Sequence, residues 1–140
     1  MKKILFLFAL TFSVIVAFTQ PFFEKTRTMN AAGLQLYVVS PSDLGYEKNM
    51  IAATYDDIIT QASSKGYRPC PEYITNKLFE TFSDGMTGRE SSSFKWLKVV
   101  TPSGIYTIGK NENGKFMDRS SRNTFHVFLS HSHACWVFIK

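Results

Sequence analysis

The spacing of apolar residues changes once along this chain of 140 residues, and that change constrains the fold most. Between residues 54 and 82 apolar side chains recur every three or four positions, which is typical of helices. From residue 94 onward they tend to alternate with polar ones, and glycine, proline or asparagine separates the runs. Helices followed by meandering strands predict an α+β protein, with two helices packed on one face of an antiparallel sheet of about four to five strands.

Both helices have recognisable ends. Thr54 can cap the first helix by accepting a hydrogen bond from the backbone N–H of Asp57, and Gly66 suits its C-terminal end. Pro71 suits the first position of the second helix, which should run to about Phe82. We predict strands over residues 34–39, 94–100, 105–108, 115–117, 124–129 and 135–139.

The first residues have the layout of an export signal. Lys2 and Lys3 precede an apolar run of 15 residues, Ile4–Phe18, which is followed by a polar break. A membrane-spanning helix needs roughly 20 apolar residues, so this run fits a cleaved leader better than a span. We therefore predict a signal peptide over residues 1–19, a linker over 20–33 and a single domain over 34–140. The expected location is exported, either periplasmic or secreted; the alternative is an uncut signal anchor.

Charge is weakly informative about partners. Lys2 and Lys3 account for two of the 16 basic residues, so 14 remain against 11 acidic residues after cleavage, a net charge of +3. This mild excess permits weak attraction to anionic surfaces and does not indicate nucleic-acid binding. Contact with a membrane is expected only through an uncleaved leader.

The two cysteines, Cys70 and Cys135, form the first candidate site. In an oxidising compartment they could pair as a disulfide that pins the inter-helix link to the last strand. The alternative is two buried thiols that pack as small apolar side chains.

Histidines form the second candidate site. On an extended chain His131, His133 and Cys135 would point to one side, and His126 could join them. Imidazole and thiolate groups are ligands of zinc and copper, so this set is a weak candidate for a metal site. The alternative is a solvated turn, and no other cofactor is expected.

A hydrolytic or nucleolytic centre is the third possibility. A base and phosphate-binding cations could come from neighbouring strands, supplied by His126, His133, Arg119, Arg122 and Asp118. The spacing of these residues is not diagnostic.

A sheet surface around Trp96 is the fourth candidate. Trp96 would lie on the face opposite Leu97, with Lys95 and Lys98 beside it, and could present an aromatic and basic ligand-binding surface. The alternative is that Trp96 packs in the core.

Five short motifs occur in a familiar order. They are an acid-Leu-Gly turn, a Thr-Tyr-led helix, a Gly-x-x-x-Cys-Pro link, a Trp-Leu strand and a closing aromatic strand, here at residues 43–45, 54–58, 66–71, 96–97 and 136–140. Over residues 37–140 the chain resembles a group of small bacterial proteins without an established activity. It departs from their pattern at residues 73–77. The resemblance implies one domain and no particular chemistry.

No assembled catalytic motif stands out, so the sequence favours a non-catalytic binding or interaction module over an enzyme. Its partner would be a protein or a component of the cell envelope. A metal-binding exported protein and a secreted hydrolase or ribonuclease-like toxin are the alternatives.

Overall fold

The computed structural model describes residues 27–82, 96–131 and 134–140. Its strands are β1 (Arg27–Ala31), β2 (Leu34–Val39), β3 (Ala52–Ala53), β4 (Trp96–Thr101), β5 (Gly104–Asn111), β6 (Gly114–Ser121), β7 (Val127–Phe128) and β8 (Ala134–Phe138); its helices are α2 (Tyr55–Ser64), α3 (Tyr73–Thr81) and the short 3₁₀ helix η2 (Ser42–Leu44). Six strands form one sheet in the order β1-β2-β8-β4-β5-β6, and β3 pairs with β7 in a separate ribbon.

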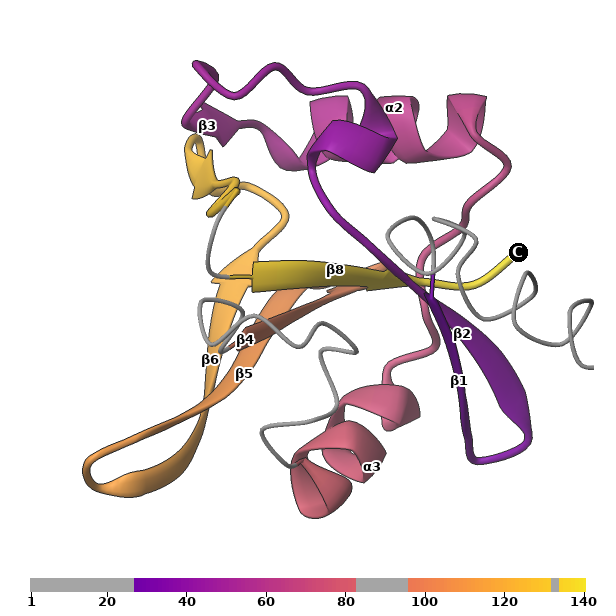
Figure 1. Cartoon of the computed structure of the whole chain (residues 1–140), viewed down its shortest axis with the longest axis vertical. Helices are drawn as coiled ribbons and strands as arrows, with labels where there is room; N and C mark the ends of the chain where they lie inside the picture. The colour runs from indigo at the N-terminus through magenta and orange to yellow at the C-terminus, as the bar shows by residue number, and fades with distance from the viewer. Residues whose placement is uncertain (1–26, 83–95, 132–133) are drawn as a thin grey trace, which may run out of the picture.

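The α+β class is confirmed, but the sheet is larger than predicted and is mixed. β4 and β8 run parallel, whereas the other neighbouring strands are antiparallel. The two helices also lie on opposite faces of the sheet rather than on one (Figure 1). Each helix covers its own hydrophobic cluster, so the described part of the chain has three layers.

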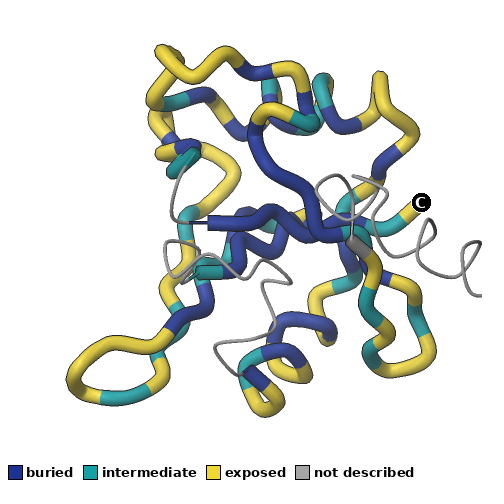
Figure 2. The backbone as a smooth tube through the Cα atoms, in the orientation of Figure 1, coloured by how far each residue is buried: buried dark blue, intermediate teal, exposed yellow. Residues whose placement is uncertain are grey.

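β8 is the strand that joins the two clusters. All five of its residues are buried, and it lies between β2 and β4 in the centre of the sheet (Figure 2). Trp136 and Phe138 belong to the cluster under α2, whereas Cys135 and Val137 belong to the cluster under α3. A continuous apolar run is typical of a strand that is buried on both faces.

The first predicted helix is confirmed with its capping residue. The side chain of Thr54 accepts a hydrogen bond of 3.1 Å from the backbone N–H of Asp57. Gly66, at φ +83°, takes the left-handed conformation that ends the helix, which glycine adopts without a steric penalty. Tyr55, Ile58 and Ala62 lie on the buried face of α2.

The link between the helices crosses from one face of the sheet to the other. The backbone N–H of Arg68 donates to the carbonyl of Ile139, and that of Cys70 donates to the carbonyl of Val100, both at 2.7 Å. These bonds hold the link against the ends of the central strands. α3 then begins at Tyr73, two residues later than predicted, and buries Ile74 and Leu78.

The N-terminal part of the domain differs from the prediction. Residues 27–31, predicted as part of the linker, form the edge strand β1, which pairs with β2. Ala32 and Gly33 have φ values of +48° and +79°, so a tight two-residue turn connects the two strands.

The strand predicted over residues 124–129 is also only partly formed. Residues 127 and 128 alone pair, with β3 rather than with the main sheet. The predicted signal peptide, residues 1–19, lies outside the described residues. In the part of the chain that is described, no helix has both the length and the apolar character needed to cross a membrane.

Candidate functional site

One part of the sheet face on the α2 side carries the predicted Trp96 surface. Trp96 and Lys98 alternate with the buried residues Leu97 and Val99, which face α3. In the sheet register, Lys98 lies beside Trp136 on β8 and beside Thr107 on β5. Strand alternation therefore places these side chains on one surface. Lys95, the third residue of the prediction, lies outside the described residues.

Lys98 is unusual because it is a lysine inside a sheet. Its side chain is 8% exposed. The Nζ atom lies 3.4 Å from the hydroxyl oxygen of Thr107 and 5.6 Å from the centre of the Trp136 ring. Over the described residues it forms no ion pair with a carboxylate. Burial lowers the pKa of the Lys98 ammonium because the charged form loses its hydration.

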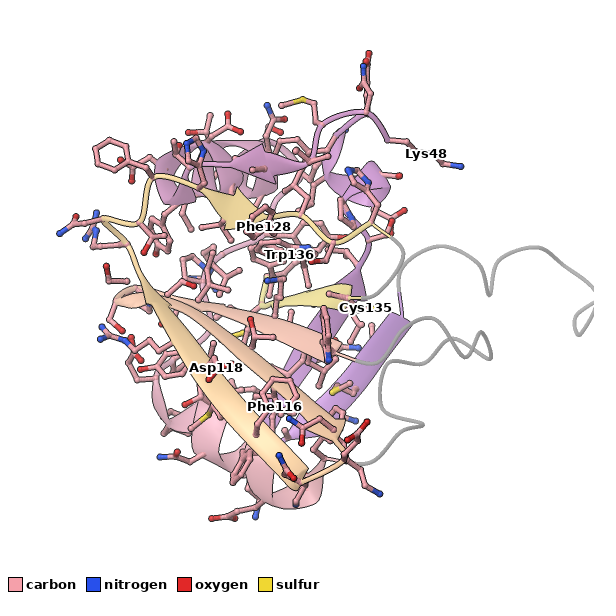
Figure 3. All side chains as sticks on the ribbon, turned by 90° about the vertical axis from the view of Figure 1, so that its left-hand side faces the viewer. Lys48, Phe116, Asp118, Phe128, Cys135 and Trp136 are labelled. Carbon is pink, nitrogen blue, oxygen red and sulfur yellow. The ribbon has the colours of Figure 1, made fainter. Side chains whose placement is uncertain are left out.

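Aromatic side chains form the row of the sheet face next to that of Lys98. Trp96 and Phe116 flank Gly109, where an added Cβ would meet Trp96 and would lie 2.8 Å from Phe116 Cζ. Only glycine leaves room for both rings at that position. Asp118 is exposed at the edge of the same face. Figure 3 shows Phe128, Trp136, Asp118 and Phe116 following one another down this side of the molecule. We call Trp96, Lys98, Thr107, Phe116 and Trp136 the lysine site.

A second surface lies on the ribbon formed by β3 and β7. Val127 and Leu129 are buried, so strand alternation points Phe128 outward between them. Phe125 precedes the strand and is exposed as well. Four apolar side chains on these two segments are exposed, and we call them the ribbon patch: Met50 (43%), Ile51 (71%), Phe125 (81%) and Phe128 (63%). The pairing of Ala52 with Phe128 and the bond from the Leu129 N–H to the Ile51 carbonyl bring the segments together.

The predicted histidine residues have different surroundings. His126 is exposed on the ribbon, and His133 lies outside the described residues. The Nε2 atom of His131 lies 2.6 Å from the carbonyl oxygen of Met50. The N–H of Ala134 donates to the carbonyl of Ser130, whose φ is +52°. Cys135 therefore points into the α3-side cluster rather than along a shared extended face.

The described residues contain no group of three or more His, Cys, Asp or Glu side chains that could hold a metal ion. Because His133 is not among them, the zinc or copper site stays a prediction.

The predicted disulfide is wrong: Cys70 and Cys135 are buried as thiols and are not joined to each other. The thiol of Cys70 donates a hydrogen bond of 3.6 Å to the carbonyl of Val137. Val137 lies two residues beyond Cys135, and two residues advance a strand by about 7 Å. A disulfide would need the Cβ atoms within about 4 Å. Hydrogen bonds, rather than a disulfide, connect the link to the last strand.

The residues of the predicted hydrolytic centre come from both sides of the sheet. Asp118 and Arg119 are consecutive on β6, so their side chains point to opposite faces. The Arg119 guanidinium lies 5.9 Å from the ring of Tyr106, and that of Arg122 lies 5.6 Å from the ring of Tyr55. The two arginines therefore lie against different aromatic rings and do not form a common site.

The ribbon patch was missed by reasoning from the sequence. A signal was present, because Phe128 lies between two apolar residues. A strand that buries Val127 and Leu129 must expose Phe128. What the pattern did not show is that the partner segment, residues 50–53, also presents apolar side chains outward.

Comparisons with known proteins identify no relative: no family model, curated protein or solved structure matches the chain.

Proposed function

We propose that this chain is an exported, non-catalytic binding module that contacts a partner protein through the ribbon patch. The observation that carries the proposal is the exposure of two phenylalanine side chains, Phe125 at 81% and Phe128 at 63%, on a ribbon that also exposes Ile51. Each phenylalanine offers on the order of 150–250 Å² of surface to a partner. Contiguous exposed apolar patches larger than a few hundred Å² are uncommon on monomers, and the largest patch on a protein is often an interaction site.

The chemistry of the patch favours a protein partner over nucleic acid. Aromatic residues and methionine are enriched at protein interfaces, and the four side chains of the patch carry no charge. Binding to phosphate groups would instead require a cluster of lysine and arginine. The patch is small, so the contact would belong to the weak or transient class of interfaces unless further surface joins it.

Site-specific photo-crosslinking in the cells that produce the chain tests this proposal. The full chain carries p-benzoylphenylalanine in place of Phe128, and a matched variant carries it in place of Tyr73, which is 55% exposed on α3. We expect a discrete protein adduct from position 128 and none from position 73. The additional change Phe125→Ser should reduce the yield at position 128.

Three outcomes would contradict the proposal. They are equal labelling from both positions, labelling of lipid alone, and no adduct from position 128. Tyr73 is a suitable control because it is aromatic and exposed yet lies on the helix that covers the opposite face of the sheet.

A further inference from the structure

The lysine site contains a buried positive charge that has no negatively charged partner among the described residues. Lys98 is 8% exposed, and an ammonium group can donate three hydrogen bonds. The Thr107 hydroxyl, at 3.4 Å, accepts one weak bond, and the Trp136 ring at 5.6 Å offers a cation–π contact. Neither partner carries a negative charge, and a buried charge is unfavourable unless it is paired.

The position of Trp136 is fixed, so it can serve as one wall of a binding site. Its Nε1 atom donates a hydrogen bond of 3.1 Å to the carbonyl of Leu129, and its side chain is fully buried. The opposite side is more open, because Thr107 is half-buried and Asp118 is exposed. A ligand would therefore approach Lys98 from the side of β5 and β6.

The charge of the site limits the class of ligand. Lys98 is the only cation on its row of the described sheet face, which continues through Thr107 to Asp118. A phosphate dianion is usually held by several donors or by the bidentate guanidinium of arginine, whereas a single carboxylate matches a single ammonium. Asp118 lies two strands away in the same row, and no ion pair joins it to Lys98.

Aromatic rings beside the ammonium indicate what the rest of the ligand is like. Trp96 and Phe116 lie on the same face, one row from Lys98, and are half-buried. Their exposed parts can cover a flat apolar group.

We propose that the lysine site binds the carboxylate of a small aromatic organic acid, with the carboxylate on Lys98 and the apolar part against Trp96 and Phe116. This site is separate from the ribbon patch, so the proposal goes beyond the binding function proposed above and does not depend on it.

Intrinsic fluorescence tests the proposal directly, because Trp96 and Trp136 are the two tryptophans of the chain. The full chain is titrated with sodium benzoate and, separately, with benzamide, which has the same shape without the charge. We expect benzoate to change the tryptophan emission, with half-saturation at about 1–10 mM, a modest affinity consistent with one ion pair and one apolar contact. Benzamide should bind at least about tenfold more weakly.

Two variants separate the site from general effects of salt. Lys98→Met removes the charge and keeps a long apolar side chain, whereas Lys110→Met removes an exposed charge from the same hairpin. We expect Lys98→Met to abolish the response to benzoate and Lys110→Met to keep it. Lys98→Met should fold, because replacing a buried charge by an apolar side chain is often neutral or stabilising.

The proposal is overturned if benzoate does not change the tryptophan emission at concentrations up to on the order of 0.5 M, 50-fold above the expected half-saturation, with ionic strength held constant. Equal binding of benzamide would also overturn it. A response that persists in Lys98→Met also overturns it. Asp84 and Glu90 lie outside the described residues and are tested by the variants Asp84→Asn and Glu90→Gln. If either variant responds to benzoate and the unaltered chain does not, a carboxylate of the chain itself pairs with Lys98, and the proposal fails.

Discussion

Cys70 illustrates how burial, rather than pairing, determines the chemistry of a side chain in this protein. It is fully buried and contacts the carbonyl of Val137 through its thiol. Burial raises the pKa of this thiol to about 12, because the thiolate would lose its hydration without gaining a positive partner. The sequence is compatible with both a disulfide and two buried thiols. The choice depended on a strand offset of two residues, which no local pattern encodes.

The raised pKa makes stability depend on pH in the alkaline range. Since the folded-state pKa lies above that of an exposed thiol, about 8.5, the stabilising contribution is complete below about pH 8. It is lost as the pH rises towards 12. Between pH 8 and pH 10 we expect the free energy of unfolding to fall by roughly 1.5–2 kcal/mol more in the unaltered chain than in Cys70→Ala. Urea unfolding at both pH values measures this difference.

Tyrosine and lysine titrations contribute equally to both chains and cancel in that comparison. Identical pH profiles for the two chains would show that Cys70 is accessible to water in the folded protein.

At the scale of elements, local signals were sufficient for α2 and insufficient for β1 and β7. The Thr54 cap, the spacing of Ile58 and Ala62, and Gly66 all depend on neighbours within a few residues. β1 lacks such signals, because Asn30 and Ala31 have low strand propensity, and it forms only because β2 offers an edge to pair with. The formation of β1 therefore depends on its pairing with β2 and not on the strand propensity of its own residues.

Substitution of the helix cap tests the local part of this argument. Thr54→Ala leaves the backbone N–H of Asp57 without its acceptor, so we expect a loss of about 1 kcal/mol in the free energy of unfolding. The matched control is Thr60→Ala, an exposed threonine inside the same helix, where alanine should be neutral or slightly stabilising. Chemical denaturation of both variants gives the comparison. Equal losses would mean that the cap bond contributes nothing specific.

For the whole molecule, β8 couples the two hydrophobic clusters. Its side chains alternate between the α2 side and the α3 side, so neither cluster can lose its packing without exposing the same central strand. The candidate sites follow from this arrangement: β8 supplies Trp136 to the lysine site, and the chain between β6 and β8 forms half of the ribbon. Trp96 and Lys98 lie on one face of the sheet, but the sequence did not indicate that Lys98 would be buried.

Coupling through β8 predicts a single unfolding transition. Ile58→Ala opens a cavity under α2 and Ile74→Ala opens one under α3; both residues are fully buried. We expect each change to cost about 2–5 kcal/mol and to move the far-UV circular dichroism and tryptophan fluorescence midpoints together. Separate midpoints for the two signals in Ile58→Ala would show that the clusters unfold independently.

Local sequence patterns were enough to predict the α+β class and the ends of the first helix, because those patterns depend on residues that lie close together in the chain. Tertiary structure alone decided that the helices lie on opposite faces, that β8 runs parallel to β4, and that the two cysteines stay apart. Those features depend on which strands pair and in what register, and a strand's own residues are compatible with several partners. The burial of Lys98 belongs to the same group, since it follows from the strands placed on either side of β4.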